Sequence, residues 1–323
     1  MATYKGIRGL TIRTIAGDAS PLIAGDIWYN STLGKIKGAK LPAGAWASGG
    51  NLNNAKWKMA GAGIQTAAII AGGQRPPGSV VEAETYDGSS WTEVGDINTA
   101  RRGLPGVGTQ TAAMIIGGFP GAKDEVEQYD GSSWTEVADL TVGRQWGAAA
   151  GTQTAALYWS GYTHPAAQTA TAELWNGASW TEVGDLNQAR YYARACCGTS
   201  TAALQIGGWV QTPPAKVALV EEWNGSTWTE IADISTTREM AVGAGITTAA
   251  LVAGGADDSG NTANTEQFDG TAWAEVANLA TARVQLGTAN PAPNTLALVM
   301  GGDPATNVTE EWTQTRNVKT ITD

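Results

Sequence analysis

Few side chains in this 323-residue sequence could catalyse a reaction or bind a metal. The one histidine, His164, lies in the stretch "GYTHPAAQ", and one imidazole cannot build a multi-histidine metal site. The two cysteines, Cys196 and Cys197, are adjacent, and neighbouring cysteines rarely form a disulfide with each other. No phosphate-binding loop, zinc-protease motif or nucleophile elbow is present. The sequence therefore predicts no catalytic residue, no metal site and no cofactor.

Five arginines recur at a fixed distance from a tryptophan, a pattern that could bind an anion or hold the chain together. Each arginine follows its tryptophan by ten positions; the pairs are Trp91 and Arg101, Trp134 and Arg144, Trp180 and Arg190, Trp228 and Arg238, and Trp273 and Arg283. Lys56 follows Trp46 at the same distance. One basic residue at one place in each copy favours a structural brace, because charges buried between packed units must be paired. We expect the partner to be an acidic group such as the Glu of "WTEV" or the Asp of "GDL".

These pairs belong to a repeat of about 45 residues. An apolar run ending in two small residues occurs six times, at 67–73, 112–118, 155–161, 202–208, 249–255 and 296–302. Each unit is predicted to contain four short strands, and the "DG" or "NG" before most of the tryptophans predicts a tight hairpin between the last two. Four strands per unit with a period of 40–50 residues are typical of a β-propeller blade.

The register of the repeat predicts how the two ends of the chain meet. Trp46 supplies a last strand before the first complete unit, and the sequence reaches a third strand near residues 308–315. We therefore predict an all-β, six-bladed β-propeller of four-stranded blades over residues 43–323, closed by an N-terminal outer strand, after a basic arm over residues 1–42. The tail 316–323 also resembles a strand and could compete for the same closing position.

Composition excludes several classes of protein. The 42 glycines and 14 tryptophans argue against a helical fold, and no apolar run is long enough for a transmembrane helix. Residues 1–60 contain 8 Lys/Arg and 2 Asp, whereas the remainder contains 12 Lys/Arg and 28 Asp/Glu. An acidic body repels phosphate, so we predict neither nucleic-acid binding nor membrane binding. The basic arm could dock on an acidic partner or pack on its own body.

Two resemblances suggest a function. The six apolar runs, five of which end in a glycine pair and the third in Ser-Gly, are each followed by an aromatic residue and then, in most copies, a tryptophan. This pattern resembles the kelch repeat, although these copies are more uniform than kelch blades usually are. The stretch "AGDIWYNSTLGKIKG" at 24–38 resembles a hairpin phrase that recurs in bacteriophage virion proteins, especially tail and fibre proteins. Together they imply a non-enzymatic structural or adhesion protein of the virion, assembled in the host bacterial cytoplasm and present in several copies per particle. The arm would attach to other virion proteins through Lys5, Arg8, Arg13, Trp28, Tyr29, Lys35 and Lys37.

The alternative is a glycan-active enzyme on the same scaffold. Kelch-type folds include galactose oxidase, whose copper site needs more imidazoles than His164 can supply. Sialidases are six-bladed and use an arginine cluster, but their aspartate box shares only Asp-Gly-x-x-Trp with "YDGSSW". We therefore predict that the protein is not an enzyme.

The length of the repeat varies mainly in the loop after each glycine pair. A rigid scaffold with variable loops on one face is a common arrangement for binding. The resulting hypothesis is that this face binds a host surface glycan, a receptor or a neighbouring virion protein. The expected binding residues are Arg75, Phe119, Tyr162, His164 and Trp209.

Overall fold

The computed structural model describes residues 12–19, 27–40, 43–165, 167–315 and 317–321, and its regular elements are all strands, β1 to β34. No helix in these ranges could cross a membrane. The chain divides into a repeat domain, Ala45–Thr313, and a terminal unit formed by Met1–Gly44 with Gln314–Asp323. The expected arm residues Lys5 and Arg8 lie outside the described residues.

The repeat domain contains six four-stranded antiparallel sheets in its described residues, which confirms the all-β prediction. In the first three sheets the strands are β5 (Ala60–Ile64), β6 (Ala67–Ala71), β9 (Ala83–Tyr86) and β10 (Trp91–Val94); β11 (Gly106–Thr109), β12 (Ala112–Gly118), β13 (Lys123–Tyr129) and β14 (Trp134–Val137); and β15 (Ala148–Thr152), β16 (Ala155–Trp159), β19 (Ala172–Trp175) and β20 (Trp180–Val183). In the other three they are β21 (Ala195–Gly198), β22 (Ala203–Gln211), β23 (Pro214–Trp223) and β24 (Trp228–Ile231); β25 (Val242–Ile246), β26 (Ala249–Ala253), β29 (Thr265–Phe268) and β30 (Trp273–Glu275); and β31 (Gly287–Thr288), β32 (Leu296–Met300), β33 (Thr309–Thr313) and β4 (Ala45–Ser48). We number these sheets 1 to 6.

Three sheets carry an additional two-stranded hairpin between their second and third strands. These hairpins are β7 (Gln74–Arg75) with β8 (Gly78–Ser79), β17 (Tyr162–Thr163) with β18 (Ala167–Gln168), and β27 (Ala256–Asp257) with β28 (Gly260–Asn261). In sheets 2 and 4 the second and third strands themselves are extended instead. The loop after the glycine pair is therefore a short β-structure that differs from copy to copy.

Sheet 6 combines the two ends of the repeat domain. Strand β4 pairs antiparallel with β33, and Trp46 lies opposite Trp312. The C-terminal strand β34 (Asn317–Thr320) pairs instead with β3 (Lys35–Lys40), so it does not compete for the place of β4. The structure thus differs from the predicted boundaries at the C-terminus, because this pairing places residues 314–323 in the terminal unit.

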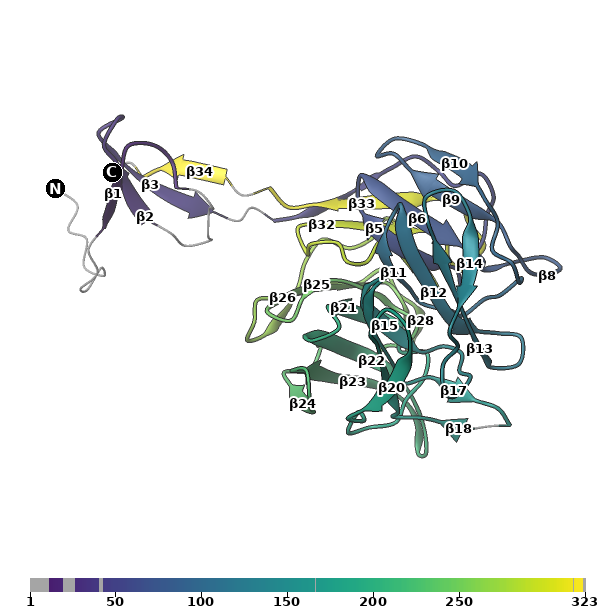
Figure 1. Cartoon of the computed structure of the whole chain (residues 1–323). Helices are drawn as coiled ribbons and strands as arrows, with labels where there is room; N and C mark the ends of the chain where they lie inside the picture. Colours follow the sequence, from purple (N-terminus) through teal and green to yellow (C-terminus); the bar gives the residue numbers. More distant parts are fainter. Residues whose placement is uncertain (1–11, 20–26, 41–42, 166, 316, 322–323) are drawn as a thin grey trace. The chain divides into compact units, whose positions relative to one another are not determined.

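Neighbouring sheets contact one another through their first strands. Along the chain, β5 lies beside β11, then follow β15, β21, β25 and β31, and β31 in turn lies beside β5. Figure 1 shows the yellow strands β32 and β33 next to the purple and blue strands of sheet 1. This arrangement is consistent with the blades of a β-propeller.

The small residues of the first strands are required by close approach. A Cβ added to Gly61 on β5 would lie 2.2 Å from the carbonyl oxygen of Thr288 on β31. A Cβ on Gly106 of β11 would lie 2.7 Å from the carbonyl oxygen of Gly61. Because such separations are shorter than van der Waals contact, glycine allows the first strands to pack this closely.

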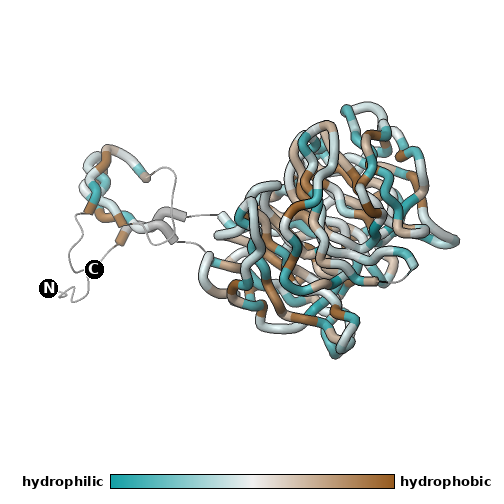
Figure 2. The backbone as a smooth tube through the Cα atoms, turned by 60° about the horizontal axis from the view of Figure 1, so that its bottom comes forward, coloured by the Kyte–Doolittle hydropathy of each residue, from teal (hydrophilic) through white to brown (hydrophobic). Residues whose placement is uncertain are grey.

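The core consists of apolar layers between adjacent sheets. Trp134 of sheet 2, for example, packs with Ile69 of sheet 1 and Ile115 of its own sheet. In Figure 2 the hydrophobic stretches lie mainly within the body of the repeat domain, and the outlying loops are largely hydrophilic. The repeated tryptophans therefore cover the gap between one sheet and the preceding sheet, where a broad side chain buries the most surface.

The terminal unit is a small sheet with its own core. Its strand order is β1 (Arg13–Ile15), β2 (Ile27–Asn30), β3 and β34. Trp28 is buried against Ala19 and Ile15, and its indole nitrogen donates to the carbonyl oxygen of Gly17 at 3.3 Å. The packing of Trp28 therefore stabilises this unit.

Candidate functional site

Each link between successive sheets is fixed by a buried ion pair, which we call a brace. The basic residue lies in the link, and the glutamate lies on the third strand of the sheet that follows. The pairs are Lys56 with Glu84, Arg101 with Glu127, Arg144 with Glu173, Arg190 with Glu221, Arg238 with Glu266, and Arg283 with Glu310. The expected partners were wrong, because the Glu of "WTEV" lies on the exposed side of the fourth strand, as Glu93 illustrates.

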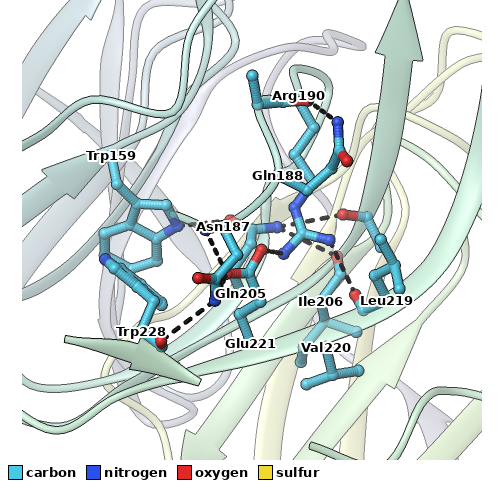
Figure 3. Close-up of polar contacts among 12 residues, drawn as sticks. Trp159, Asn187, Gln188, Arg190, Gln205, Ile206, Leu219, Val220, Glu221 and Trp228 are labelled. Atoms are coloured by element: carbon cyan, nitrogen blue, oxygen red, sulfur yellow. Dashed lines mark hydrogen bonds and ion pairs between the residues drawn. The ribbon is translucent and has the colours of Figure 1, made fainter. Parts of the chain in front are cut away.

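Figure 3 shows the brace of sheet 4 in detail. Arg190 bonds Glu221 at 2.7 Å, and its guanidinium also donates to the carbonyl oxygen of Leu219 at 3.1 Å. The second carboxylate oxygen of Glu221 accepts from the backbone and side-chain amides of Asn187, at 2.7 and 2.9 Å. The Asn187 side chain also donates to the carbonyl oxygen of Trp228 at 3.1 Å. The link is therefore bonded to the third and fourth strands of sheet 4, β23 and β24.

Arg190 stays positively charged at neutral pH in this brace. Burial lowers the pKa of Arg190 to about 10, and the charge of Glu221 opposes that change. A buried ion pair of this kind contributes little net stability, but the loss of one partner leaves an uncompensated charge in a medium of low polarity. The charge of each repeated basic residue is thus paired with the glutamate of its brace.

The two residues after each brace form a turn, and these turns together make what we call the rim. The second residue of each turn has a left-handed backbone; these residues are Lys58, Gly103, Trp146, Tyr192, Met240 and Gln285, with φ between 52° and 66°. Backbone amides connect one turn to the next: Gly103 donates to Lys58 at 2.8 Å, Trp146 to Gly103 at 2.9 Å, and Lys58 to Gln285 at 2.9 Å. Non-glycine residues in this conformation are strained, and such residues cluster at functional sites.

The side chains of the rim differ from copy to copy, unlike the braces. An aromatic cluster gathers at one part of it: the ring of Tyr191 lies 4.5 Å from that of Tyr192 and 5.1 Å from that of Tyr162, and Trp146 lies 5.3 Å from Tyr192. The ammonium group of Lys58 lies 5.3 Å from the Trp146 ring. The three tyrosines are half-buried, so each presents part of its ring at the surface.

Three of the five predicted binding residues lie at this rim. The first residue after each glycine pair forms a backbone bridge with the first residue after each brace, and this places Phe119 beside Arg102, Tyr162 beside Gln145 and Trp209 beside Tyr191. The other two predicted residues lie in the outlying hairpins. Arg75 is ion-paired with Glu82, and His164 is exposed in the turn between β17 and β18.

Several rim residues were not predicted from the sequence. Lys58, Arg102, Trp146 and Tyr191 were not proposed as binding residues, although they directly follow the repeated basic positions. A comparison of the six copies at those two positions would have found them, because "WK", "RG", "QW", "YY", "EM" and "VQ" share no pattern. Variation inside the uniform link, and not only in the long loops, was the available signal.

Some of the buried polar atoms without a protein partner lie at the rim, and others lie in the braces, such as the Nε of Arg190. In the described part of the chain those at the rim include the side-chain carbonyl oxygens of Gln145 and Gln285, one carboxylate oxygen of Glu239 and the Nε of Arg102. Burial raises the pKa of Glu239, and the charge of Lys216 opposes the increase. Unsatisfied buried groups are uncommon in folded proteins, so this combination of acceptors and donors fits a ligand rich in hydroxyl groups.

The opposite ends of the first strands are chemically different. Turn residues there, including Ile64, Thr109, Gln110 and Pro291, line a cavity of about 330 Å³ that carries no charged side chain. The amide of Gln110 donates to the carbonyl oxygens of Ala68 and Tyr86, at 3.2 and 2.6 Å, so it is used to join sheets 1 and 2. The rim is therefore the stronger candidate site.

The expected attachment residues of the terminal unit differ in their exposure to solvent. Trp28 was wrong as a surface contact, because it is 1% exposed and forms the core of this unit. Arg13, Tyr29 and Lys35 are exposed, and Lys37 on β3 is half-buried. Of the described attachment residues, Arg13, Tyr29 and Lys35 are therefore the ones whose side chains are open to contact.

The described part of the structure contains no cluster of metal-binding side chains. In the described ranges, no group of three or more His, Cys, Asp or Glu side chains is placed to hold a metal ion. Cys196 and Cys197 are buried as free thiols, and burial raises the pKa of Cys196 to about 11 and that of Cys197 well above its ordinary value. Neither thiol is therefore ionised at neutral pH.

Comparison with known proteins assigns no family to this chain. No protein-family model matches the sequence, and no curated protein matches it. The kelch-like and bacteriophage resemblances therefore remain predictions that rest on the sequence motifs alone.

Proposed function

We propose that the repeat domain is a six-bladed, kelch-like β-propeller closed by its N-terminal outer strand. Support comes from the pairing of β4 with β33 and from the contact between β31 and β5. Further support comes from Gln65 of sheet 1, whose amide donates to the carbonyl oxygens of Ala297 and Trp312 in sheet 6. On this proposal the rim surrounds the axis at one end of the propeller.

We further propose that the rim binds a saccharide. The observation that carries this proposal is the half-buried cluster of Tyr162, Tyr191 and Tyr192, placed next to buried acceptors and donors. Aromatic faces bury the apolar faces of sugar rings, and a few fixed polar groups give orientation. Binding here would use the positions at which the copies differ, so the uniform part of the repeat need not change for a ligand.

The proposed activity is binding without catalysis. A sialidase-like activity would need the repeated arginines to bind substrate, but each of them is already buried in a brace. Their charges are compensated by glutamates and cannot serve a ligand without breaking the links. A glycan-active enzyme is retained as an outcome of the test below.

We assign the protein to the particle of a bacteriophage, with the terminal unit as the attachment segment. The support is the phrase "GDIWYN" at 25–30 together with the exposed side chains of Arg13, Tyr29 and Lys35. Deletion of residues 1–40 should prevent the protein from joining virions while it still accumulates in infected cells. Incorporation of the deleted protein would contradict this assignment.

A glycan array tests the binding proposal. The intact protein should retain at least one class of oligosaccharide, and Tyr191→Ala and Tyr162→Ala should each lower its affinity by about tenfold, because one aromatic stacking contact is lost. Tyr29→Ala, which removes an exposed tyrosine from the terminal unit, serves as the matched control. Retention that survives both rim substitutions would refute the site, and hydrolysis or oxidation of a bound sugar would favour the enzyme.

A further inference from the structure

Arg194 breaks the pattern of the first strands. It lies four positions after the basic residue of its brace, where the other copies have the small or apolar residues Ala60, Pro105, Ala148, Val242 and Gly287. Sheet 4 therefore carries a long cation where the first strands converge, a position that small residues occupy elsewhere. A charge that occurs in one copy only is not required by the repeat.

The Arg194 side chain reaches from sheet 4 to the opposite side of the rim. One terminal nitrogen donates to the carbonyl oxygen of Met59 at 2.6 Å and lies 3.4 Å from that of Leu104. The other terminal nitrogen is buried and has no hydrogen-bond partner, and no ion pair of Arg194 occurs within the described ranges. Burial lowers its pKa to about 10, so the guanidinium is still charged at neutral pH.

Two further cations belong to the same rim. Lys58 donates to the side-chain oxygen of Gln74 at 2.8 Å, and Arg102 donates to the hydroxyl of Ser79 at 3.0 Å while stacking on Phe119 at 4.2 Å. These hydrogen-bond partners are neutral, and neither cation forms an ion pair in the described part of the chain.

Lys58 lies close enough to Arg102 and Arg194 for their charges to affect its pKa. Burial lowers the pKa of Lys58, the charge of Arg102 lowers it further and that of Arg194 adds to this effect, whereas Asp303 acts in the opposite direction. Three positive charges are thus held together on a domain that is otherwise acidic. Such a concentration of charge is costly without an anion, and guanidinium groups match the two oxygens of an oxyanion well.

We propose that Lys58, Arg102 and Arg194 bind an oxyanion substituent, a carboxylate, sulfate or phosphate, carried by the saccharide at the rim. This inference rests on the proposed function, because the tyrosine cluster would hold the sugar ring that bears the anion. The acidic surface elsewhere disfavours long polyanions, so the ligand class is a short acidic oligosaccharide.

Titration calorimetry of the full chain tests this site with matched oligosaccharides. Tetragalacturonate and a sulfated galactan tetrasaccharide are compared with the neutral galactotetraose, at about 50 mM and about 500 mM NaCl so that screening differs. At low salt the anionic probes should bind about tenfold more tightly than the neutral one, and the preference should shrink at high salt. The better of the two anionic probes shows whether the site prefers a carboxylate or a sulfate.

Substitutions then assign the preference to residues. Arg194→Met should remove most of the anion preference and leave the affinity for galactotetraose unchanged. Arg102→Met should also remove most of the anion preference. Arg194→Lys should retain part of the preference, which separates lost charge from lost packing, and thermal unfolding shows whether each variant is folded. Lys35→Met removes an exposed positive charge from the terminal unit and should have no effect.

The outcomes are distinct. Equal affinity for anionic and neutral probes would overturn the oxyanion site but leave the saccharide proposal standing. A preference that Arg194→Met and Arg102→Met leave intact would overturn the assignment to these residues. Binding of none of the three probes by the intact protein would count against both proposals.

Discussion

Arg101 and Arg102 are adjacent in the chain and identical in type, yet they have opposite environments. Arg101 is fully buried, bonds Glu127 at 2.5 Å and fixes the link before sheet 2. Arg102 is half-buried at the rim, stacks on Phe119 and pairs with no carboxylate in the described structure. The first recurs in every copy as a basic residue, whereas the second has no equivalent.

The difference between brace and rim shows how a repeated fold can acquire one specific site. A residue that each copy needs for its link cannot vary without loss of stability. The side chains of the next two residues take no part in the ion pair, so their identity can differ from copy to copy. Change can therefore accumulate at the rim while the fold remains intact.

The largest effect is expected from a broken brace. Arg190→Met should lower the free energy of unfolding by about 3–5 kcal/mol, because Glu221 is left buried and unpaired. Urea unfolding followed by tryptophan fluorescence measures this change. The double variant Arg190→Met with Glu221→Leu should recover much of the loss, and a single-variant loss below about 1 kcal/mol would contradict the role of the brace.

A smaller loss is expected where β4 completes sheet 6. The Trp46 ring lies 5.5 Å from that of Trp312, and its indole nitrogen donates to the hydroxyl of Thr265 at 3.1 Å. Trp46→Ala should lower the free energy of unfolding by about 2–3 kcal/mol, since this side chain is only partly buried. Tyr29→Ala in the terminal unit is the control, and an equal effect of the two would argue against closure through β4.

Substitutions in the two small residues that end each apolar run should have a still smaller effect, which depends on the position. Gly161 has a φ of 107°, and an added Cβ would lie 2.8 Å from the carbonyl oxygen of Gln145, so Gly161→Ala should cost about 1–3 kcal/mol. Its neighbour Ser160 already tolerates a side chain at a φ of 58°, with a buried hydroxyl that has no hydrogen-bond partner. Ser160→Gly should therefore be neutral or stabilising in differential scanning calorimetry; a large loss would show that the hydroxyl is needed.

The smallest effect concerns one hydrogen bond between sheets 1 and 6. The hydroxyl of Tyr86 donates to Glu311 at 2.6 Å, and burial, followed by this bond, raises its pKa to about 12. Tyr86→Phe should cost about 1 kcal/mol at pH 8. Because the folded pKa exceeds the unfolded value near 10, the stability from this group is complete below pH 10 and is lost as the pH rises towards 12.

The check is the difference in unfolding free energy between Tyr86→Phe and the unchanged protein, measured from pH 8 to pH 11. Both proteins contain the same other titrating groups, so the difference isolates Tyr86. It should narrow as the pH increases above 10. A difference that stays constant over this range would show that the phenol is not held as described.

Much of the fold could be predicted because the residues that specify each repeat lie close together in the sequence. The apolar runs, the turn residues and the spacing from tryptophan to basic residue locate four strands per copy, and Trp46 indicates the extra outer strand of sheet 6. The partner of each basic residue was missed, because Glu221 and its equivalents lie about 30 positions away on a strand, and only the pairing of strands brings them to the link.

Less of the site could be predicted, for a physical reason. Loop length drew attention to Arg75 and His164, but a loop can lengthen without facing a ligand, and both residues lie in outlying hairpins. Arg194 meets Met59 across a separation of 135 residues, a contact that no local pattern encodes. Its departure from the small residues of the other copies was nevertheless visible in the sequence.

The most direct test of brace and rim makes the same substitution at the two adjacent arginines. For Arg101→Met and Arg102→Met, the free energy of unfolding and the affinity for tetragalacturonate are measured on the same samples. We predict that Arg101→Met loses about 3–5 kcal/mol of stability, whereas Arg102→Met changes stability by less than about 1 kcal/mol and weakens binding about tenfold. The account would be contradicted if Arg102→Met bound tetragalacturonate as tightly as the unchanged protein, or if the two variants were equally stable.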